Sequence, residues 1–374
     1  MPAKRFSNIE ISGIRKMFEG APPDAINLGL GEPDFQPPEC VLNALQNAVK
    51  NGFNKYGPIG GIPELRNEIA SRYNRLAPTK SENVIITDGA TEALFATIMA
   101  IIDEGDEVLI PDPGFPLYES HVKICGGKPI FYSLSQKNDF VPDTSELLGL
   151  ISPKTKAIIV NSPSNPTGGV IPVKCIEELV AIADQKNIVV ISDEVYDHII
   201  YEEKHESFWG RCRNAVIINS FSKTYAMTGW RIGFLLAPPH LMPHIFKSHY
   251  HLIACPPTPT QYAALEALKK ADADVTRMVN EFRKRRDYIV NALNSIPGFN
   301  CLTPKGAFYV FPEFTLPKTS MELATTLVQH GVICTPGSAF GRNGERHIRF
   351  SYANSLENIK KAIERVTNVI ETLS

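Results

Sequence analysis

The sequence has no long apolar run and no strong excess of either charge, and both absences exclude classes of protein. No apolar stretch approaches the roughly 18 residues that span a bilayer, and no apolar segment follows the charged N-terminus. The formal net charge is -2 over 374 residues, which leaves no overall basic field for nucleic acid or anionic lipid. We therefore predict a cytoplasmic protein that binds small molecules and has neither a nucleic-acid nor a membrane partner.

Cysteine is also scarce, and internal repeats are missing. Seven cysteines are scattered along the chain, and no pair is spaced as C-x-x-C. A disulfide framework normally has an even set of cysteines, and a zinc site normally has closely paired ligands. We expect neither a disulfide framework nor a metal site, and we expect most of the thiols to be small core residues.

Short apolar runs alternate with helical patterns between about residues 80 and 240. Two segments, 91–102 and 174–185, carry apolar residues at spacings of three and four, as amphipathic helices do. Strands that alternate with helices predict right-handed crossovers and a mostly parallel sheet with helices on both faces, which is an α/β fold. The predicted strands are 83–87, 107–110, 156–160, 187–192, 214–219 and 231–237.

The C-terminal part has a different pattern. A long charged helical segment, 272–296, ends at Pro297-Gly298, and short strands and two further helical segments follow it. This mixture predicts a smaller α+β domain. We predict an N-terminal arm with part of the small domain (1–38), a large domain (39–275) and a small C-terminal domain (276–374).

Polar residues follow four of the predicted strands directly. They begin at Asp88, Asn161, Asp193 and Ser220, and the last group includes Lys223. Each group alone has an ordinary explanation as a turn, a helix cap or a surface loop. Ligands of a doubly wound sheet bind beyond the carboxyl ends of its strands, so we expect all four groups to face one crevice.

The four groups together suit a single ligand. A helix N-terminus binds phosphate, and hydroxyl groups with the guanidinium of Arg231 would complete the site for a dianion. An aspartate such as Asp193 keeps a ring nitrogen protonated, and a lysine such as Lys223 forms a Schiff base with an aldehyde. Phosphate, aldehyde and ring nitrogen together describe pyridoxal 5'-phosphate.

Three longer motifs occur in a fixed order: "NSPSNPTG", "SDEVY" and "SFSKTYAMTGWRIG". With these motifs the chain resembles the class I/II aminotransferases of the fold-type I pyridoxal-phosphate superfamily. The resemblance implies a large domain whose mostly parallel sheet is sandwiched by helices, a smaller α+β domain, and a homodimer with shared active sites. It extends over almost the whole chain through "INLGLGEPDF", "KYGPIGGIPELR", "TDGATEAL", "PDPGFPLY", "PKGAFYVF", "TPGSAFG" and "HIRFSYANS".

The resemblance implies three catalytic residues, Lys223, Asp193 and Tyr196, and a cofactor-binding role for Asn165. It implies that Lys223 holds the cofactor as a Schiff base and later moves the substrate's α-proton. It implies that Asp193 pairs with the ring nitrogen, and that Tyr196 and Asn165 hydrogen-bond the cofactor's phenolate oxygen.

The resemblance also implies how the rest of the cofactor is held. Phe115 matches the aromatic residue that stacks on the ring, and Tyr56 matches the tyrosine that reaches the phosphate of the neighbouring subunit. The phosphate would be held by Gly89, Ala90, Thr91, Ser220, Ser222 and Arg231.

For the substrate, the resemblance implies that Arg349 grips the α-carboxylate with its planar fork, and it also counts Asn165 among the substrate-binding residues. Gly31 would let the backbone approach the same carboxylate. Thr91 stands where one aspartate-preferring group has a lysine, which puts aspartate specificity in question. Asp88 and Glu92 flank the dianion site and are expected to face away from it. Phe18, Phe115, Tyr309 and Phe340 are candidates to line a pocket for an aromatic or aliphatic side chain, the alternative being that they are core residues, and the sequence leaves the side-chain pocket open.

We therefore predict an aminotransferase that passes nitrogen between glutamate/2-oxoglutarate and aspartate, alanine or an aromatic amino acid. The alternative is a β-lyase of the cysteine-S-conjugate type on the same scaffold, because both reactions use the lysine, the aspartate and the arginine. A ligand-sensing regulator would need a DNA-binding domain, and residues 1–30 are too short for one.

Overall fold

The computed structural model describes residues 3–6, 9, 20–202 and 204–373. Its main feature is a seven-stranded sheet in the order β2-β8-β7-β6-β5-β3-β4. The pairs from β4 to β7 are parallel, whereas β8 runs antiparallel to both of its neighbours. The strands are β2 (Val84–Thr87), β3 (Glu107–Asp112), β4 (Lys128–Ser133), β5 (Thr155–Asn161), β6 (Val189–Asp193), β7 (Ala215–Ser220) and β8 (Gly233–Leu236).

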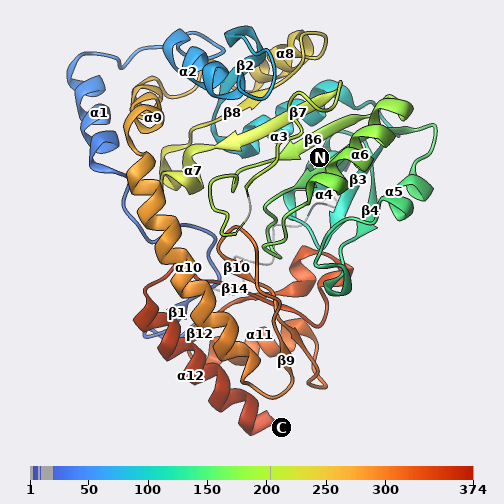
Figure 1. Cartoon of the computed structure of the whole chain (residues 1–374), viewed down its shortest axis with the longest axis vertical. Helices are drawn as coiled ribbons and strands as arrows, with labels where there is room; N and C mark the ends of the chain where they lie inside the picture. Colours follow the sequence, from blue (N-terminus) through green and yellow to red (C-terminus); the bar gives the residue numbers. More distant parts are fainter. Residues whose placement is uncertain (1–2, 7–8, 10–19, 203, 374) are drawn as a thin grey trace.

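Helices cover both faces of this sheet (Figure 1), because alternate residues of its buried strands point to opposite sides. In β5, Ala157 and Ile159 join one apolar cluster while Ile158 and Val160 join the other. The first cluster includes α3 (Gly89–Ile101), α4 (Leu117–Ile124) and α8 (Met242–Leu252). The second includes α1 (Glu39–Lys50), α2 (Pro63–Tyr73), α5 (Thr144–Leu150), α6 (Val173–Lys186) and α9 (Thr258–Lys270).

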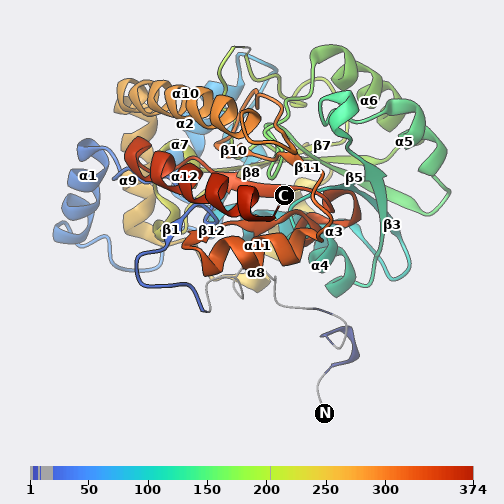
Figure 2. The ribbon, with the colours of Figure 1, turned by 90° about the horizontal axis from the view of Figure 1, so that it is seen from below.

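The long helix α10 (Asp272–Asn294) runs from the sheet region to the C-terminal part of the chain (Figure 1). There β14 pairs with β10 and β13, β9 pairs with β11, and the N-terminal strand β1 pairs with β12. Helices α11 and α12 pack together at this end of the molecule (Figure 2). The elements are β1 (Ile26–Asn27), β9 (Phe299–Asn300), β10 (Tyr309–Val310), β11 (Glu313–Phe314), β12 (Val332–Ile333), β13 (Thr335–Pro336), β14 (Ile348–Ser351), α11 (Ser320–Gln329) and α12 (Leu356–Leu373).

Short helices connect several of these elements. The one that matters for the site is α7 (Phe221–Thr224), which follows β7 directly. The 3-10 helices are η1 (Lys4–Phe6), η3 (Ser81–Asn83), η4 (Gln136–Asn138), η5 (Thr228–Trp230), η6 (Gly337–Phe340) and η7 (Arg342–Gly344).

The predicted α/β fold is confirmed, and each of the six predicted strands of the sheet is present. Strand β4 was not predicted. It lies at the edge of the sheet, contains Pro129, and exposes half of its residues, so its sequence lacks the continuous apolar run of a central strand. The limits 1–38, 39–275 and 276–374 for the domains stay a prediction.

Two kinds of feature are absent from the described residues. No helix in this part of the chain is long and apolar enough to cross a membrane. No group of three or more histidine, cysteine or acidic residues among them is arranged to hold a metal ion.

Candidate active site

A cavity of about 290 Å³ lies beyond the carboxyl ends of β5, β6 and β7, where an α/β sheet binds its ligands. We call the part formed by Tyr118, Asp193 and Tyr196 the inner end. The part formed by the N-terminus of α3 and Arg231 is the outer end. The lining residues are Gly29, Leu30, Gly31, Ala90, Thr91, Leu94, Phe115, Tyr118, Asn161, Asn165, Asp193, Val195, Tyr196, Ser220, Ser222, Lys223, Thr228, Arg231, Tyr309 and Arg349.

Asp193 ends β6 and is 7% exposed. Its Oδ2 accepts a 2.7 Å hydrogen bond from the Tyr118 hydroxyl, and its Oδ1 accepts a long one, 3.4 Å, from the Val195 N–H. Burial disfavours the charged carboxylate and raises the pKa of Asp193 to about 6, although both hydrogen bonds act in the opposite direction. Among the described residues, no cationic side chain hydrogen-bonds to the Asp193 carboxylate. The carboxylate is therefore available to pair with a cationic group of a ligand.

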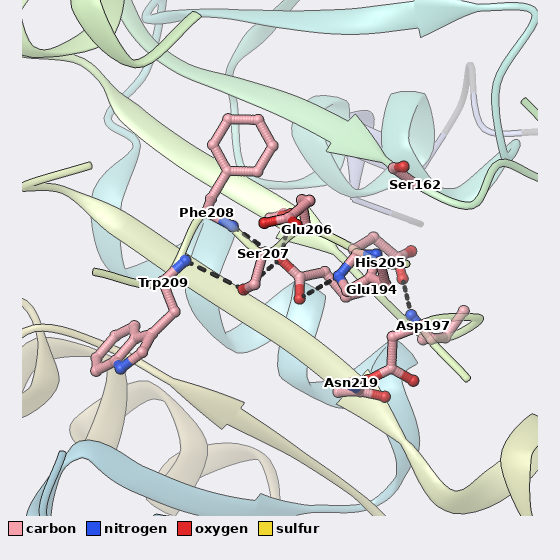
Figure 3. A network of polar contacts seen from close by, with 12 residues as sticks. Ser162, Glu194, Asp197, His205, Glu206, Ser207, Phe208, Trp209 and Asn219 are labelled. Atoms are coloured by element: carbon pink, nitrogen blue, oxygen red, sulfur yellow. Dashed lines mark hydrogen bonds and ion pairs between the residues drawn. The ribbon is translucent and has the colours of Figure 1, made fainter. Parts of the chain in front are cut away.

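A second buried carboxylate fixes the chain directly after Asp193. Glu194 is 1% exposed, and its oxygens contact His205 Nε2 at 2.9 Å, Ser207 Oγ at 2.9 Å and the Phe208 N–H at 3.3 Å (Figure 3). Its backbone N–H also donates to the Ile218 carbonyl of β7. Glu194 thus ties the end of β6 to the 205–209 segment on the side away from the cavity.

Lys223 lies in α7, whose first residue follows β7 without a loop. Ser220 caps this turn by accepting a hydrogen bond from the Ser222 N–H at 3.1 Å. The cap directs Lys223 into the cavity, where its Nζ donates to the Gly31 carbonyl at 2.6 Å. Burial lowers the pKa of Lys223 to about 8, so a useful fraction of the amine is neutral and nucleophilic near neutral pH.

Arg349 comes from β14 in the C-terminal part and is 3% exposed. Its Nη1 donates to Asn165 Oδ1 at 2.9 Å, and its Nη2 donates to the Gly29 carbonyl at 2.5 Å. The rings of Tyr309 and Phe340 lie 4.6 and 4.8 Å from its Cζ. The Nε of Arg349 is buried and has no partner among the described residues, which leaves a donor for an anionic ligand.

The outer end is built from backbone as much as from side chains. Gly89 opens α3 with φ +74°, and a Cβ there would lie 2.4 Å from Arg231 Nη2. Arg231 itself has φ +51°, an uncommon conformation for a residue with a side chain. Its guanidinium donates to the carbonyls of Thr228 and Asp88 at 3.1 and 3.2 Å. This holds a cation beside the free N–H groups of the first turn of α3, an arrangement suited to a phosphate.

Two tyrosine hydroxyls meet between the inner end and Arg349. Tyr196 and Tyr309 are 2.8 Å apart at their Oη atoms, and burial raises the pKa of Tyr196 well above its ordinary value. Gly31 faces this pair, since a Cβ at Gly31 would lie 2.3 Å from Tyr309 Oη. Burial raises the pKa of both hydroxyls, so both are neutral, and because one donates to the other, one O–H remains to donate to an anionic oxygen of a ligand.

Most of the predicted site residues line this one cavity. Gly89 does not line the cavity but lies against the guanidinium of Arg231. Tyr56 lies apart and is 89% exposed, and Phe340 reaches the site through Arg349. Phe18 lies outside the described residues. The predicted residues that line the cavity are Gly31, Ala90, Thr91, Phe115, Asn165, Asp193, Tyr196, Ser220, Ser222, Lys223, Arg231, Tyr309 and Arg349.

The sequence did not indicate Tyr118 as a residue of the site, and it gave Asn161 no role of its own. Tyr118 lies three residues after Phe115 in "PGFPLY", and that helical spacing could have indicated that both face the same cavity. Asn161 accepts from the Asn165 N–H at 2.8 Å and donates to the Asp193 carbonyl at 2.9 Å. The sequence places Asn161 at a strand end that faces the crevice, but it does not indicate the contact with Asp193, which comes from another strand.

Comparisons with known proteins identify the family of the chain. Residues 23–366 match the family model described as aminotransferase class I and II. The chain is 44% identical to the "probable aspartate aminotransferase" of Methanocaldococcus jannaschii, covering 99% of this chain and 100% of that one.

Two further proteins are similar over their whole lengths. The "aromatic-amino-acid aminotransferase 2" of Thermococcus litoralis is 35% identical, covering 98% of this chain and 97% of that one. The solved structure of an alanine aminotransferase from Pyrococcus furiosus superposes with a TM-score of 0.94 at 34% identity and covers 100% of both chains.

Proposed function

This chain belongs to the class I and II aminotransferases, and on that premise we propose that it exchanges nitrogen between glutamate/2-oxoglutarate and a second amino acid. It is a pyridoxal-phosphate-dependent transaminase. The relatives described above are named for aspartate, aromatic amino acids and alanine, and these are the candidates for the second substrate. None of those three names describes a lyase.

The cavity residues fit pyridoxal 5'-phosphate. When bound, the cofactor supplies an aldehyde that condenses with amines and a ring that withdraws electrons from the substrate carbon. The observation that carries the proposal is that one cavity of about 290 Å³ contains Lys223, Asp193 and Arg349. The amine of Lys223 matches the aldehyde of the cofactor, and the buried carboxylate of Asp193 matches its ring nitrogen. The guanidinium of Arg349, whose Nε has no partner among the described residues, matches the α-carboxylate of an amino-acid substrate.

We infer the following residue roles from these contacts. Lys223 Nζ, with its pKa lowered to about 8 by burial, attaches the cofactor and carries the transferred proton. Asp193, buried and oriented by Tyr118, holds a proton on the ring nitrogen of the cofactor. Asn165 and Tyr196 face an anionic oxygen, and Arg349 binds the α-carboxylate.

We infer that the outer end holds the phosphate. Arg231, the hydroxyls of Ser220, Ser222 and Thr91, and the first turn of α3 would supply its donors. Phe115 would lie against the ring.

We also propose a homodimer. Tyr56 is 89% exposed on the loop between α1 and α2, and a large, fully exposed aromatic side chain suits a contact with a second copy of the chain. Light scattering measures the mass directly, and a monomer at working concentrations would refute this part. The cytoplasmic location stays a prediction.

A screen of amino donors against 2-oxoglutarate tests the proposed reaction. We expect glutamate formation with at least one of aspartate, alanine, phenylalanine and tyrosine. Pyruvate and ammonia released from a substrate with a β-leaving group, without turnover of any amino donor, would favour the lyase reaction instead.

A further inference from the structure

A buried ion pair lies next to the outer end, away from the cavity wall. His249 of α8 is 0% exposed, and its Nδ1 lies 3.1 Å from Oε1 of Glu92, which stands in the first turn of α3. Its Nε2 lies 2.8 Å from the carbonyl oxygen of Ile59, in the loop between α1 and α2. One imidazole therefore joins three segments that are far apart in the sequence.

The partners determine the charge of the ring. The Ile59 carbonyl can only accept, so Nε2 carries a proton. Glu92 Oε2 already accepts the Asp88 N–H at 3.1 Å, as a carboxylate does, and Oε1 then accepts from Nδ1. Burial opposes a charge on His249, but the hydrogen bond and the charge of Glu92 outweigh it, and the pKa of His249 is raised.

The ion pair with His249 compensates the negative charge of Glu92 close to the proposed phosphate position. Glu92 stands one residue after Thr91, and a free carboxylate in the first turn of α3 would repel a dianion bound there. Its side chain is instead turned toward α8, is 9% exposed, and is paired with His249. The negative charge is thus compensated on the far side of the helix, and the first-turn N–H groups remain available.

The same ring fixes a second segment beside the outer end. The Gly60 carbonyl accepts from the Ile86 N–H of β2 at 3.0 Å, and the Ile62 N–H donates to Gln261 Oε1 at 2.8 Å. Strand β2 leads directly to Asp88 and α3. The contact between His249 and Ile59 completes this attachment, so the loop and the helix start are held in one arrangement.

We propose that His249 is a positioning residue of the phosphate end of the cofactor site, acting as a buried imidazolium that compensates Glu92 and anchors the 54–62 loop to the N-terminus of α3. The inference rests on the proposed placement of the phosphate at that N-terminus.

Two substitutions separate the contacts of the ring. His249→Asn retains a neutral donor near Glu92 and loses the contact with Ile59, while His249→Gln retains a donor near Ile59 and loses the charge beside Glu92. His121 is a matched control, because it is also buried, lies in α4, and has an Nδ1 without a partner among the described residues. Cofactor-free protein is titrated with pyridoxal phosphate and with pyridoxal, which lacks the phosphate.

We expect both His249 variants to bind pyridoxal phosphate about tenfold more weakly, with little change for pyridoxal, and His121→Gln to change neither. Hydrogen exchange of residues 54–62 should accelerate in His249→Asn. Equal losses for both ligands, or none for either, would overturn the inference. Arg231→Gln separates the two proposals: if it lowers the affinity for the phosphate-bearing ligand while the His249 variants do not, the phosphate site stands and His249 has no part in it. If neither does, both proposals are wrong.

Nitrogen NMR tests the charge of the His249 ring directly, first in the unsubstituted protein and then in Glu92→Gln. We expect both ring nitrogens of His249 to carry protons at neutral pH, and we expect Glu92→Gln to convert the ring to the neutral form. A neutral His249 in the unsubstituted protein would contradict the proposal.

Discussion

The two ends of the cavity differ in the exposure of their polar residues and in the kind of groups that they offer a ligand. At the inner end, Tyr118 and Asp193 are 1% and 7% exposed, and burial shifts the pKa of Asp193 to about 6. At the outer end, Arg231 and Thr91 are exposed, and the donors are backbone N–H groups, hydroxyls and a guanidinium. Under the proposed residue roles, we expect the inner end to control protons and the outer end to retain an anion.

The largest expected effect comes from Lys223→Ala. It removes the amine that we propose attaches the cofactor, so we expect catalysis to fall at least about 1000-fold and the absorbance of the covalently held cofactor to disappear. The fold should survive, because the side chain faces a cavity rather than the apolar core. Absorbance and circular dichroism check the two parts, and an unaltered cofactor spectrum would rule out Lys223.

Asp193→Asn tests the proton control of the inner end, and we expect kcat to fall about 100- to 10,000-fold. It should also stabilise the cofactor-free protein. Because the pKa of Asp193 rises from 3.8 to about 6 on folding, the folded state binds the proton more tightly, and stability is lost as pH rises between these values. The Asp193→Asn variant does not lose this stability. At pH values above the folded pKa, its advantage in the free energy of unfolding is roughly 3 kcal/mol.

Urea unfolding of the cofactor-free protein on both sides of this pH interval checks the sign. The stability advantage of the Asp193→Asn variant should be small below the interval and full above it. An advantage that does not depend on pH would show that Asp193 is not a strained buried acid.

Arg349→Lys tests substrate binding at the junction of the two parts of the chain. A lysine cannot reproduce the planar fork that contacts both Asn165 and the Gly29 carbonyl. We expect KM for the amino acid to rise about 10- to 100-fold. Arg346→Lys is the control, since Arg346 is exposed on the segment preceding β14. Equal KM values for the two variants would place the carboxylate elsewhere.

Tyr118→Phe should have the smallest effect. Its hydroxyl donates to Asp193 at 2.7 Å and lowers the pKa of that carboxyl against the larger influence of burial. Removing it raises the pKa further, so the acid limb of the kcat profile should move to higher pH, and kcat should fall about 3- to 10-fold. Tyr132→Phe also removes a buried hydrogen bond, to the Ile159 carbonyl, and should leave the pH profile unchanged.

The sequence was most informative where function and local pattern coincide. The strand ends at Asn161, Asp193 and Ser220 were predictable because apolar runs stop there and polar residues begin. The edge strand β4 and the residue Tyr118 were not predicted, since neither belongs to a continuous apolar run.

Long-range contacts explain the rest of what the sequence did not reveal. The pairing of His249 with Glu92 joins residues 157 positions apart, and no periodicity encodes such a contact. The same holds for the contact between Arg349 and Asn165, which are 184 positions apart; the resemblance to a family suggested that both serve the substrate, but not that they touch.

The most direct test of the comparison measures Asp193→Asn and Arg231→Gln together, each for pyridoxal-phosphate affinity and for kcat at saturating cofactor. We expect a crossed result: Asp193→Asn loses kcat with little change in cofactor affinity, and Arg231→Gln loses about tenfold or more in affinity with little change in kcat. If both variants lose the same quantity, the two ends of the cavity do not have separate functions and the account is wrong.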